Sequence, residues 1–276
     1  MNVIVQYNPD GRMGNRMFQY AFGYILAKKG KKELIHDPLP NFGISASLGS
    51  PRTLATVDNK GQVRAYEPVI RTFQTWGEQD ADMDVLLNHK GSTVVNSLVQ
   101  KSRYYIDHKD ILREVFSIKT QETINKDSLV VHVRETDYTQ INTFLGYNFY
   151  KAMIDDSGFT DVKIVTDNSN CDTVEKLVSD GCTLVTEGYV DKFQHHCDQR
   201  SISDFRTLLL SENIALSQSS FSWWAAFLGN HKKIIFPYIT PCITCDTDKN
   251  MWPLHPEEDD ADLYFNFNGE SVKYVL

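Results

Sequence analysis

The 276-residue sequence has no apolar run long enough for a membrane-spanning helix, which needs about 20 residues. Its start, MNVIVQYNPDGR, lacks both the positive charge and the small-residue cleavage pattern of a signal peptide. A net charge of −8 leaves little room for the concentrated basic surface that nucleic acids require. These absences predict a cytoplasmic protein with no transmembrane segment and no nucleic-acid partner.

Cysteine is scarce and irregularly spaced. The five cysteines are Cys171, Cys182, Cys197, Cys242 and Cys245. The last two form a C-x-x-C pair, but no second pair stands at zinc-finger spacing. His195 and His196 could add ligands beside Cys197, although a solvated polar loop explains that run better. The pattern therefore predicts reduced thiols and no metal centre.

The N-terminal half opens with a pattern of strand, turn and helix. Residues 3–6 form a short, mostly β-branched run, residues 8–11 form a strong turn cluster, and apolar residues recur at helical spacing from Met13. Two lysines followed by Gly30 predict the end of this helix. Beyond it we expect a loop at 41–67, a strand at 69–76, a helix at 110–116 and a polar linker at 120–127.

From residue 129 onward, short apolar runs alternate with helical patterns. The strands are expected at 129–133, 162–166, 183–186, 214–216 and 233–236. The helices are expected around 149–154, 173–178, 205–210 and 223–228. This alternation predicts a parallel sheet with helices on both faces. Since such sheets bind ligands at the carboxyl ends of their strands, we expect the site residues to follow these strands.

The first candidate segment is the turn before the N-terminal helix, where Gly11 and Gly14 precede Asn15. Two glycines allow close backbone approach, and the helix N-terminus behind them favours anions. A glycine pair at such a turn also has a purely conformational explanation, and the spacing is neither a P-loop nor a dinucleotide fingerprint.

The second candidate segment follows the most apolar strand. Alternation places His132 and Arg134 on one face of this strand and Val133 and Glu135 on the other. An arginine at a strand end can bind a diphosphate and neutralise the charge of a departing leaving group. The alternative is a structural ion pair of Arg134 with Glu135 or Asp137.

The third candidate segment, SQSSFSWWAA at 217–226, connects a strand to a helix. Ser219, Ser220 and Ser222 could cap this helix while their hydroxyls and the free backbone N–H groups face an anion. N-capping with two packed tryptophans explains the same residues almost as well.

Taken together, these segments resemble the α-1,2-fucosyltransferase family (glycosyltransferase family eleven). GRMGNRMFQYAF at 11–22 is similar to the family's GRLGNQMFQYA, HVRETDY at 132–138 to HxRRxDY, and SQSSFSWWAA to SNSSFSWWAA. Shorter segments at 72–76, 111–116 and 165–168 also resemble the family, and all matches keep its order across residues 3–237.

The resemblance implies an α/β fold of GT-B type, with two Rossmann-like domains facing across a cleft. We expect an acceptor-side domain at 1–125 and a nucleotide-sugar-binding domain at 126–276. The implied reaction is inverting transfer of L-fucose from GDP-fucose to a glycan hydroxyl, α-1,2 to galactose, with no metal or other cofactor. The partners are thus a GDP-sugar donor and an oligosaccharide acceptor.

The resemblance also assigns site residues. Arg134 would bind the donor diphosphate as the catalytic arginine. The donor-binding residues would be His132, Arg134, Asp167, Ser219, Ser220, Phe221 and Ser222. The cleft would be lined from the N-terminal side by Gly11, Arg12, Gly14 and Asn15. The general base stays open among residues of suitable type: Asp10, His36, Glu67 and Asp137.

The sequence departs from the family in three places. Glu135 stands where the family has a second arginine, Gln218 replaces an asparagine, and the segment between Asp137 and Tyr150 is short. Strand alternation favours a Glu135 side chain that points away from the donor, with a basic partner of its own. A carboxylate facing the phosphates is the alternative.

Three other functions compete with this one. A metal-dependent GT-A transferase would need an Asp-x-Asp motif closing an apolar strand. Motifs of this kind at 82–84 and 246–248 follow no apolar strand, which argues against that class. A transferase for another GDP-sugar and a non-catalytic glycan- or nucleotide-binding relative are the remaining alternatives.

Overall fold

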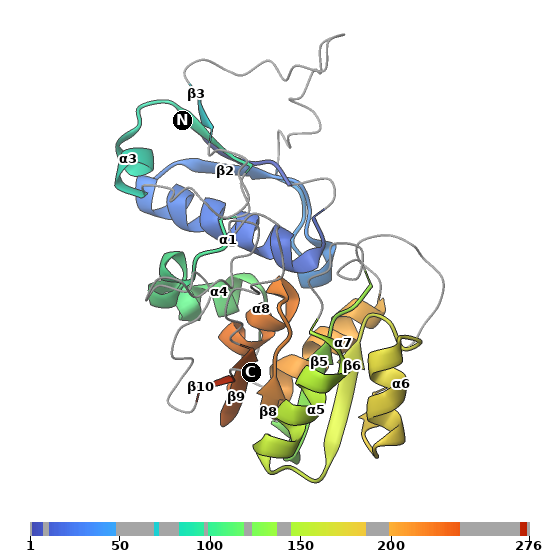
Figure 1. Cartoon of the computed structure of the whole chain (residues 1–276). Helices are drawn as coiled ribbons and strands as arrows, with labels where there is room; N and C mark the ends of the chain where they lie inside the picture. Colours follow the sequence, from blue (N-terminus) through green and yellow to red (C-terminus); the bar gives the residue numbers. More distant parts are fainter. Residues whose placement is uncertain are drawn as a thin grey trace, which may run out of the picture. The chain divides into compact units, whose positions relative to one another are not determined.

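The structure is a computed structural model of the whole chain (Figure 1). It describes residues 2–7, 11–47, 69–71, 83–96, 99–118, 123–136, 145–185, 199–237 and 271–274. The chain divides into two compact units, the first within Met1–Ile118 and the second beginning at Lys119. Each unit contains a sheet whose described strand pairs are all parallel.

Unit 1 has a four-stranded sheet in the order β2-β1-β4-β3. The strands are β1 (Asn2–Val5), β2 (Glu33–His36), β3 (Val69–Arg71) and β4 (Ser92–Val95). The helices are α1 (Met13–Gly30), α3 (Met83–Asn88) and α4 (Lys109–Val115), with short 3-10 turns η1 (Pro40–Phe42), η2 (Ser102–Tyr104) and η3 (Ile106–His108). Because β1 is flanked by strands on both sides, the carboxyl ends of β2, β1 and β4 lie next to one another.

Helix α1 confirms the predicted helix from Met13. It packs closely on β1, because a Cβ at Gly23 would lie 2.3 Å from the Val5 Cγ2 atom. Lys28 and Lys29 lie in its last turn, where cations complement the helix dipole. The helix ends at Lys31, which has a left-handed conformation and donates its N–H to the last turn.

Unit 2 has a six-stranded sheet in the order β10-β9-β8-β5-β6-β7. The strands are β5 (Ile124–Val133), β6 (Val162–Thr166), β7 (Thr183–Leu184), β8 (Ser211–Ala215), β9 (Lys233–Pro237) and β10 (Ser271–Tyr274). The helices are α5 (Gly146–Ser157), α6 (Asp172–Ser179), α7 (Gln199–Leu210) and α8 (Ser220–Leu228). The alternation predicted from residue 129 onward is thereby confirmed.

The central strand β5 is buried on both faces. On one face, Leu129, Val131 and Val133 pack in a single core with residues of α5 and α6. On the other face, the His132 ring stacks on Phe221 of α8. Helices α5 and α6 therefore cover one side of the sheet and α8 lies against the other (Figure 1).

The linker predicted at 120–127 is wrong for its second half, because β5 already begins at Ile124. Ile124 pairs with Ser211, and the register shifts before Leu129. Asn125 has a φ of 50° in this irregular stretch, and its amide donates to Ser211 Oγ at 3.0 Å. The expected domain boundary between residues 125 and 126 thus falls inside a strand, and the two units divide earlier.

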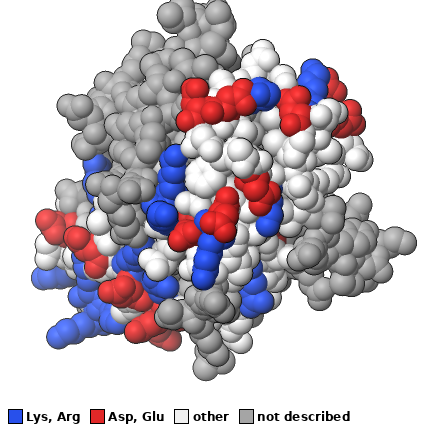
Figure 2. Space-filling view, turned by 90° about the horizontal axis from the view of Figure 1, so that it is seen from below, with Lys and Arg blue, Asp and Glu red and all other residues white. Residues whose placement is uncertain are grey.

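Several predicted segments lie wholly or partly outside the described residues. Strand β3 covers the first three residues of the strand predicted at 69–76, and only residues 41–47 of the predicted loop at 41–67 are described. Among the described helices, none has the length and apolar character needed to cross a bilayer. On the face that Figure 2 shows, lysines and arginines lie among aspartates and glutamates, so this face presents charges of both signs.

Candidate active site

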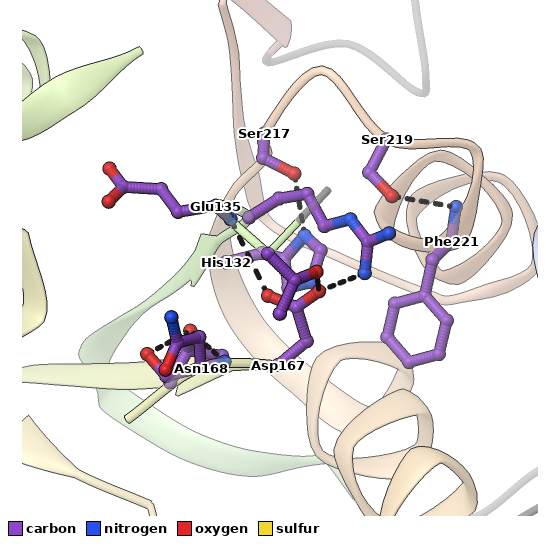
Figure 3. A network of polar contacts seen from close by, with 10 residues as sticks. His132, Glu135, Asp167, Asn168, Ser217, Ser219 and Phe221 are labelled. Carbon is purple, nitrogen blue, oxygen red and sulfur yellow. Dashed lines mark hydrogen bonds and ion pairs between the residues drawn. The ribbon is translucent and has the colours of Figure 1, made fainter. Parts of the chain in front are cut away.

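The candidate active site lies at the carboxyl edge of the unit 2 sheet. Strands β6 and β8 flank β5 in parallel, so all three end at the same edge. Val133 pairs with Thr166, which makes Arg134 and Asp167 the first residues beyond the two strands. The segment after β8 adds Ser217 and Ser219 (Figure 3). This is the edge at which parallel α/β sheets bind ligands.

Asp167 gathers three donors from the segment that follows β5. Its Oδ2 atom accepts from Arg134 Nη1 in an ion pair and from the Thr136 hydroxyl. Its Oδ1 atom accepts from the Glu135 backbone N–H at 3.5 Å. The side chains of Arg134 and Asp167 are 10% and 21% exposed, so the pair is reachable from solvent while its geometry is fixed by packing. The arrangement presents a guanidinium at a strand end.

This ion pair differs from both local pairs that the sequence offered. Arg134 pairs with Asp167 of the neighbouring strand, whereas Glu135 points elsewhere and Asp137 lies outside the described residues. An ion pair across two strands holds the guanidinium at the sheet edge. Asp167, expected from the resemblance to lie near the nucleotide, is thus in direct contact with Arg134.

His132 lies in the protein interior next to this pair. It is 3% exposed, its ring stacks on Phe221 with centroids 5.4 Å apart, and its Nδ1 lies 2.7 Å from Ser217 Oγ. Burial lowers its pKa to about 4, with Arg134 adding to the shift and Asp167 opposing it. The ring is therefore neutral at pH 7. It packs beneath the ion pair and has little surface for contact with a nucleotide.

The serines at the start of α8 divide into different roles. Ser219 is the N-cap, and its hydroxyl accepts from the Phe221 N–H at 3.3 Å. Ser222 is fully buried and donates to the backbone carbonyls of Ser217 and Ser219. The Ser222 hydroxyl is thus used within the turn, and its assignment to the donor-binding residues stays a prediction. Ser220 and Phe221 are partly exposed at the helix start.

Glu135 extends to the side away from Phe221 and Ser219 (Figure 3). It is 4% exposed, and its Oε1 atom has no hydrogen-bond partner among the described residues. The favoured orientation is thus found, but the expected basic partner is not. The neighbour is the thiol of Cys171, which precedes α6. Burial and the Glu135 carboxylate raise the pKa of this thiol to about 11, against the lowering effect of the Val174 and Thr173 N–H groups.

The residues predicted to line the cleft belong to unit 1. Gly11 and Gly14 are buried at the start of α1, and Arg12 is exposed as its N-cap, with no side-chain hydrogen bond to the helix. Asn15 Oδ1 accepts from Gln100 Nε2 at 2.8 Å, and Arg16 Nε donates to the Gly11 carbonyl at 2.8 Å. The turn thus has an ordered backbone. Its residues and the Arg134 group lie in different units.

Within the described part of the chain, no group of three or more His, Cys, Asp or Glu side chains could hold a metal ion. Cys171 and Cys182 are free thiols. Several residues that could bind a metal lie outside the described residues, namely Asp82, Asp246, Asp248, Cys242 and Cys245.

Thr136 and Ser217 are two site residues that the sequence predictions did not assign. Thr136 shares the Asp167 carboxylate with Arg134, and Ser217 fixes the His132 ring. Ser217 opens the SQSSFSWWAA segment and directly follows a predicted strand. Its position could therefore have indicated a site residue. Nothing in the sequence distinguished Thr136 from an ordinary turn residue.

The sequence matches no protein-family model and no curated protein. Similar solved structures include a variant of FUT1 from Arabidopsis thaliana in complex with GDP, at 13% identity and a TM-score of 0.50, covering 93% of this chain and 77% of that one. Fucosyltransferase NodZ from Bradyrhizobium is 12% identical, with a TM-score of 0.44 and coverage of 82% and 93%. POFUT1 in complex with GDP-fucose is 9% identical, with a TM-score of 0.44 and coverage of 85% and 97%.

The likeness to FUT1 shows the fold. The chain is an α/β protein of GT-B type, with a Rossmann-like unit built on each of its two parallel sheets. This confirms the fold class that the sequence resemblance implied. At these identities, the comparisons bear on the architecture alone.

Proposed function

We propose that this chain is a fucosyltransferase that moves L-fucose from GDP-fucose to a glycan hydroxyl. The observation that carries the proposal is Arg134, held by Asp167 at the carboxyl edge of a parallel sheet in a GT-B-type fold. The three motifs that resemble α-1,2-fucosyltransferases support it, and so does a fold shared with a structure solved with GDP. From the resemblance, we further propose inverting α-1,2 transfer to galactose.

The proposed role of Arg134 follows from its chemistry. A guanidinium carries five N–H donors in a planar fork, a geometry that matches two oxygens of a diphosphate. As the bond between the fucose C1 atom and the diphosphate breaks, negative charge grows on the leaving GDP. Arg134 would stabilise that charge without the reorganisation that solvent water requires. Asp167 and Thr136 would keep the group in position throughout.

The start of α8 would supply the second contact with the phosphates. Backbone N–H groups of a first helical turn and the helix dipole both favour an anion. The partly exposed Ser220 stands at this start, and Ser219 already holds the turn in shape. Charge neutralisation by Arg134 and a helix N-terminus can replace a divalent cation, so we propose metal-independent transfer.

A donor panel tests the proposal. The purified full chain is incubated with GDP-fucose, GDP-mannose or UDP-galactose and with lactose as the galactoside acceptor. Isothermal titration calorimetry with GDP is run on the same preparation. We expect GDP binding and transfer from GDP-fucose alone. Transfer from GDP-mannose would favour another GDP-sugar transferase, and GDP binding without turnover on a glycan acceptor panel would favour a non-catalytic relative.

A further inference from the structure

His231 lies in the segment between α8 and β9 of unit 2 and is 8% exposed. Its Nδ1 atom lies 2.7 Å from the Ser211 carbonyl oxygen. Its Nε2 atom lies 3.1 Å from the Ala225 carbonyl oxygen. Both nitrogens of this buried ring therefore face backbone carbonyl groups.

These two contacts determine how many protons the His231 ring carries. A carbonyl oxygen only accepts hydrogen bonds, and a neutral imidazole has a single N–H donor. A neutral ring would therefore direct the lone pair of its second nitrogen at the lone pairs of a carbonyl oxygen. The imidazolium form has an N–H on each nitrogen, so it can donate to Ser211 and Ala225 at the same time.

The backbone around the ring also favours a positive charge. Ala225 lies in the last turn of α8, and Ser211 directly follows the last residue of α7. The carbonyl end of a helix carries partial negative charge and stabilises a nearby cation. Burial acts in the opposite direction, because it penalises the charged form of the ring. Two charge-assisted hydrogen bonds and two helix ends offset that penalty.

Gly229, the residue that ends α8, leaves the space in which the ring lies. Its φ of −74° is open to any residue, so its backbone conformation does not require glycine. A Cβ at this position would lie 2.1 Å from His231 Nε2 and 2.7 Å from the Leu209 carbonyl oxygen of α7. A side chain at residue 229 would therefore displace the ring from the two helix ends.

The charged side chains around the ring are of both signs. Helix α8 contains no Asp, Glu, Lys or Arg. On α7, on β8 and in the segment of His231, the charged residues nearest these contacts along the chain are Asp204, Arg206, Glu212, Lys232 and Lys233. Lys233 Nζ donates to the Ser157 carbonyl oxygen at 3.2 Å. Glu212 directly follows Ser211, so a variant of Glu212 separates the effect of this carboxylate from the effect of the carbonyl groups.

We propose that His231 is a buried imidazolium at neutral pH and that it joins the ends of α7 and α8 only while both ring nitrogens carry a proton. The folded state then holds a proton that the unfolded chain releases above about pH 6.5. The contribution of the ring to stability is complete below pH 6.5 and decreases as the pH rises, until the folded ring also loses its proton. This dependence is opposite in sign to that of His132, whose neutral form the fold favours.

Nitrogen NMR of the full chain with ¹⁵N-labelled histidine rings measures the protonation state directly. At pH 7.5, a histidine with the ordinary pKa near 6.5 is about 90% neutral, so an imidazolium is distinct from such rings. We expect the His231 ring to have two protonated nitrogens at this pH, with signals that are absent from H231Q. His132 is the internal control, since burial lowers its pKa to about 4 and keeps it neutral.

Urea unfolding between pH 6 and pH 9 measures the effect of this proton on stability. The urea midpoint of the wild type should exceed that of H231Q most at pH 6, and the difference should shrink by about half by pH 9. In the matched control, H108Q, the midpoint difference from the wild type should not vary with pH. Burial and the charges of Lys29 and Lys28 lower the pKa of His108, so its ring is neutral over most of this range. E212Q should keep the imidazolium signals of His231.

Three outcomes overturn the proposal. The first is a wild-type spectrum at pH 7.5 in which no histidine ring has two protonated nitrogens, a result that needs no folded variant. The second is a midpoint difference between the wild type and H231Q that does not change with pH. The third is loss of the imidazolium in E212Q, because the Glu212 carboxylate and not the two carbonyl groups would then hold the proton.

Discussion

Arg134 and Asp167 meet across two neighbouring strands at the edge where both strands end. The register that pairs Val133 with Thr166 brings them together, although 33 positions separate them in the chain. The orientation of the Arg134 guanidinium is therefore set by the register of the sheet. The expected behaviour of several variants follows from that geometry and from the residues around it.

Removing the guanidinium should abolish transfer without unfolding the protein. For R134A we expect a loss of about 3 kcal/mol of transition-state stabilisation, or roughly 10²-fold in kcat/KM. R134K should also be poor, because an ammonium lacks the planar fork that binds two phosphate oxygens. Initial rates and a thermal melt of each variant measure the two effects. A well-folded R134A with most of its activity would contradict the assignment.

Activity should survive chelation. The proposed anion contacts are Arg134 and the N-terminus of α8, so we expect the rate in excess EDTA to equal the rate before treatment. Re-addition of Mn²⁺ or Mg²⁺ serves as the control and should change nothing. A reaction that stops with EDTA and resumes with Mn²⁺ would indicate a metal-dependent transferase.

Replacing the Glu135 carboxylate should leave nucleotide affinity almost unchanged. The side chain extends away from Phe221 and Ser219, on the side where Cys171 lies. The GDP dissociation constant of E135Q should therefore stay within a few-fold of the wild type in calorimetry. A carboxylate about 4 Å from a phosphate would instead cost about 4 kcal/mol at an effective dielectric of 20. A tenfold tightening in E135Q would thus place the carboxylate at the phosphates.

The same substitution should make Cys171 more reactive. In the wild type, burial and the Glu135 charge hold the thiol pKa near about 11, so little thiolate exists at pH 8.5. E135Q removes the charge and keeps the shape, and alkylation by iodoacetamide should quicken by at least about threefold. Peptide mass spectrometry reports each cysteine separately. Cys182 in the same sample is the internal control, and equal rates at Cys171 in both proteins would count against the contact.

His132 should make the fold sensitive to acid. Its pKa in the folded protein is about 4, below the ordinary value near 6.5, so protonation favours the unfolded chain. The neutral ring's contribution is present above pH 6.5 and is lost as the pH falls toward 4, by roughly 2 kcal/mol at pH 5. Urea unfolding at pH 7 and pH 5 measures this loss. H132N should show a shallower pH dependence, and an unchanged slope would refute the explanation.

The sequence predicted the elements whose signal is local. Helix α1 has apolar residues at helical spacing and lysines before its end, and β6 is a short run rich in β-branched residues, so both were found. The start of β5 was missed because Asn125, Lys126 and Asp127 are polar. Its strand geometry depends on pairing with Ser211, which lies far away in the chain.

In the site as well, the sequence predicted single residues but not the contacts between distant ones. Arg134 was found because a charged residue after a buried strand is a local feature, and alternation gave the direction of Glu135. The partner of Arg134 and the neighbour of Glu135 were both missed. Asp167 and Cys171 lie on or after the neighbouring strand, and only the parallel register brings them to β5. Spacing along the chain reveals local pairs and not such contacts.

The pairing of β5 with β8 also sets the order in which the protein can be built. The two strands are neighbours in the sheet, and the hydrogen-bond partner of His132 is Ser217, which lies 85 positions later in the chain. During synthesis, Arg134 and Asp167 leave the ribosome long before α8 does. A nascent chain therefore contains the Arg134 guanidinium before the helix that packs on β5 has been made. Pairings this distant close slowly. We expect nucleotide binding to appear as a late step, both at the ribosome and when the unfolded chain is refolded.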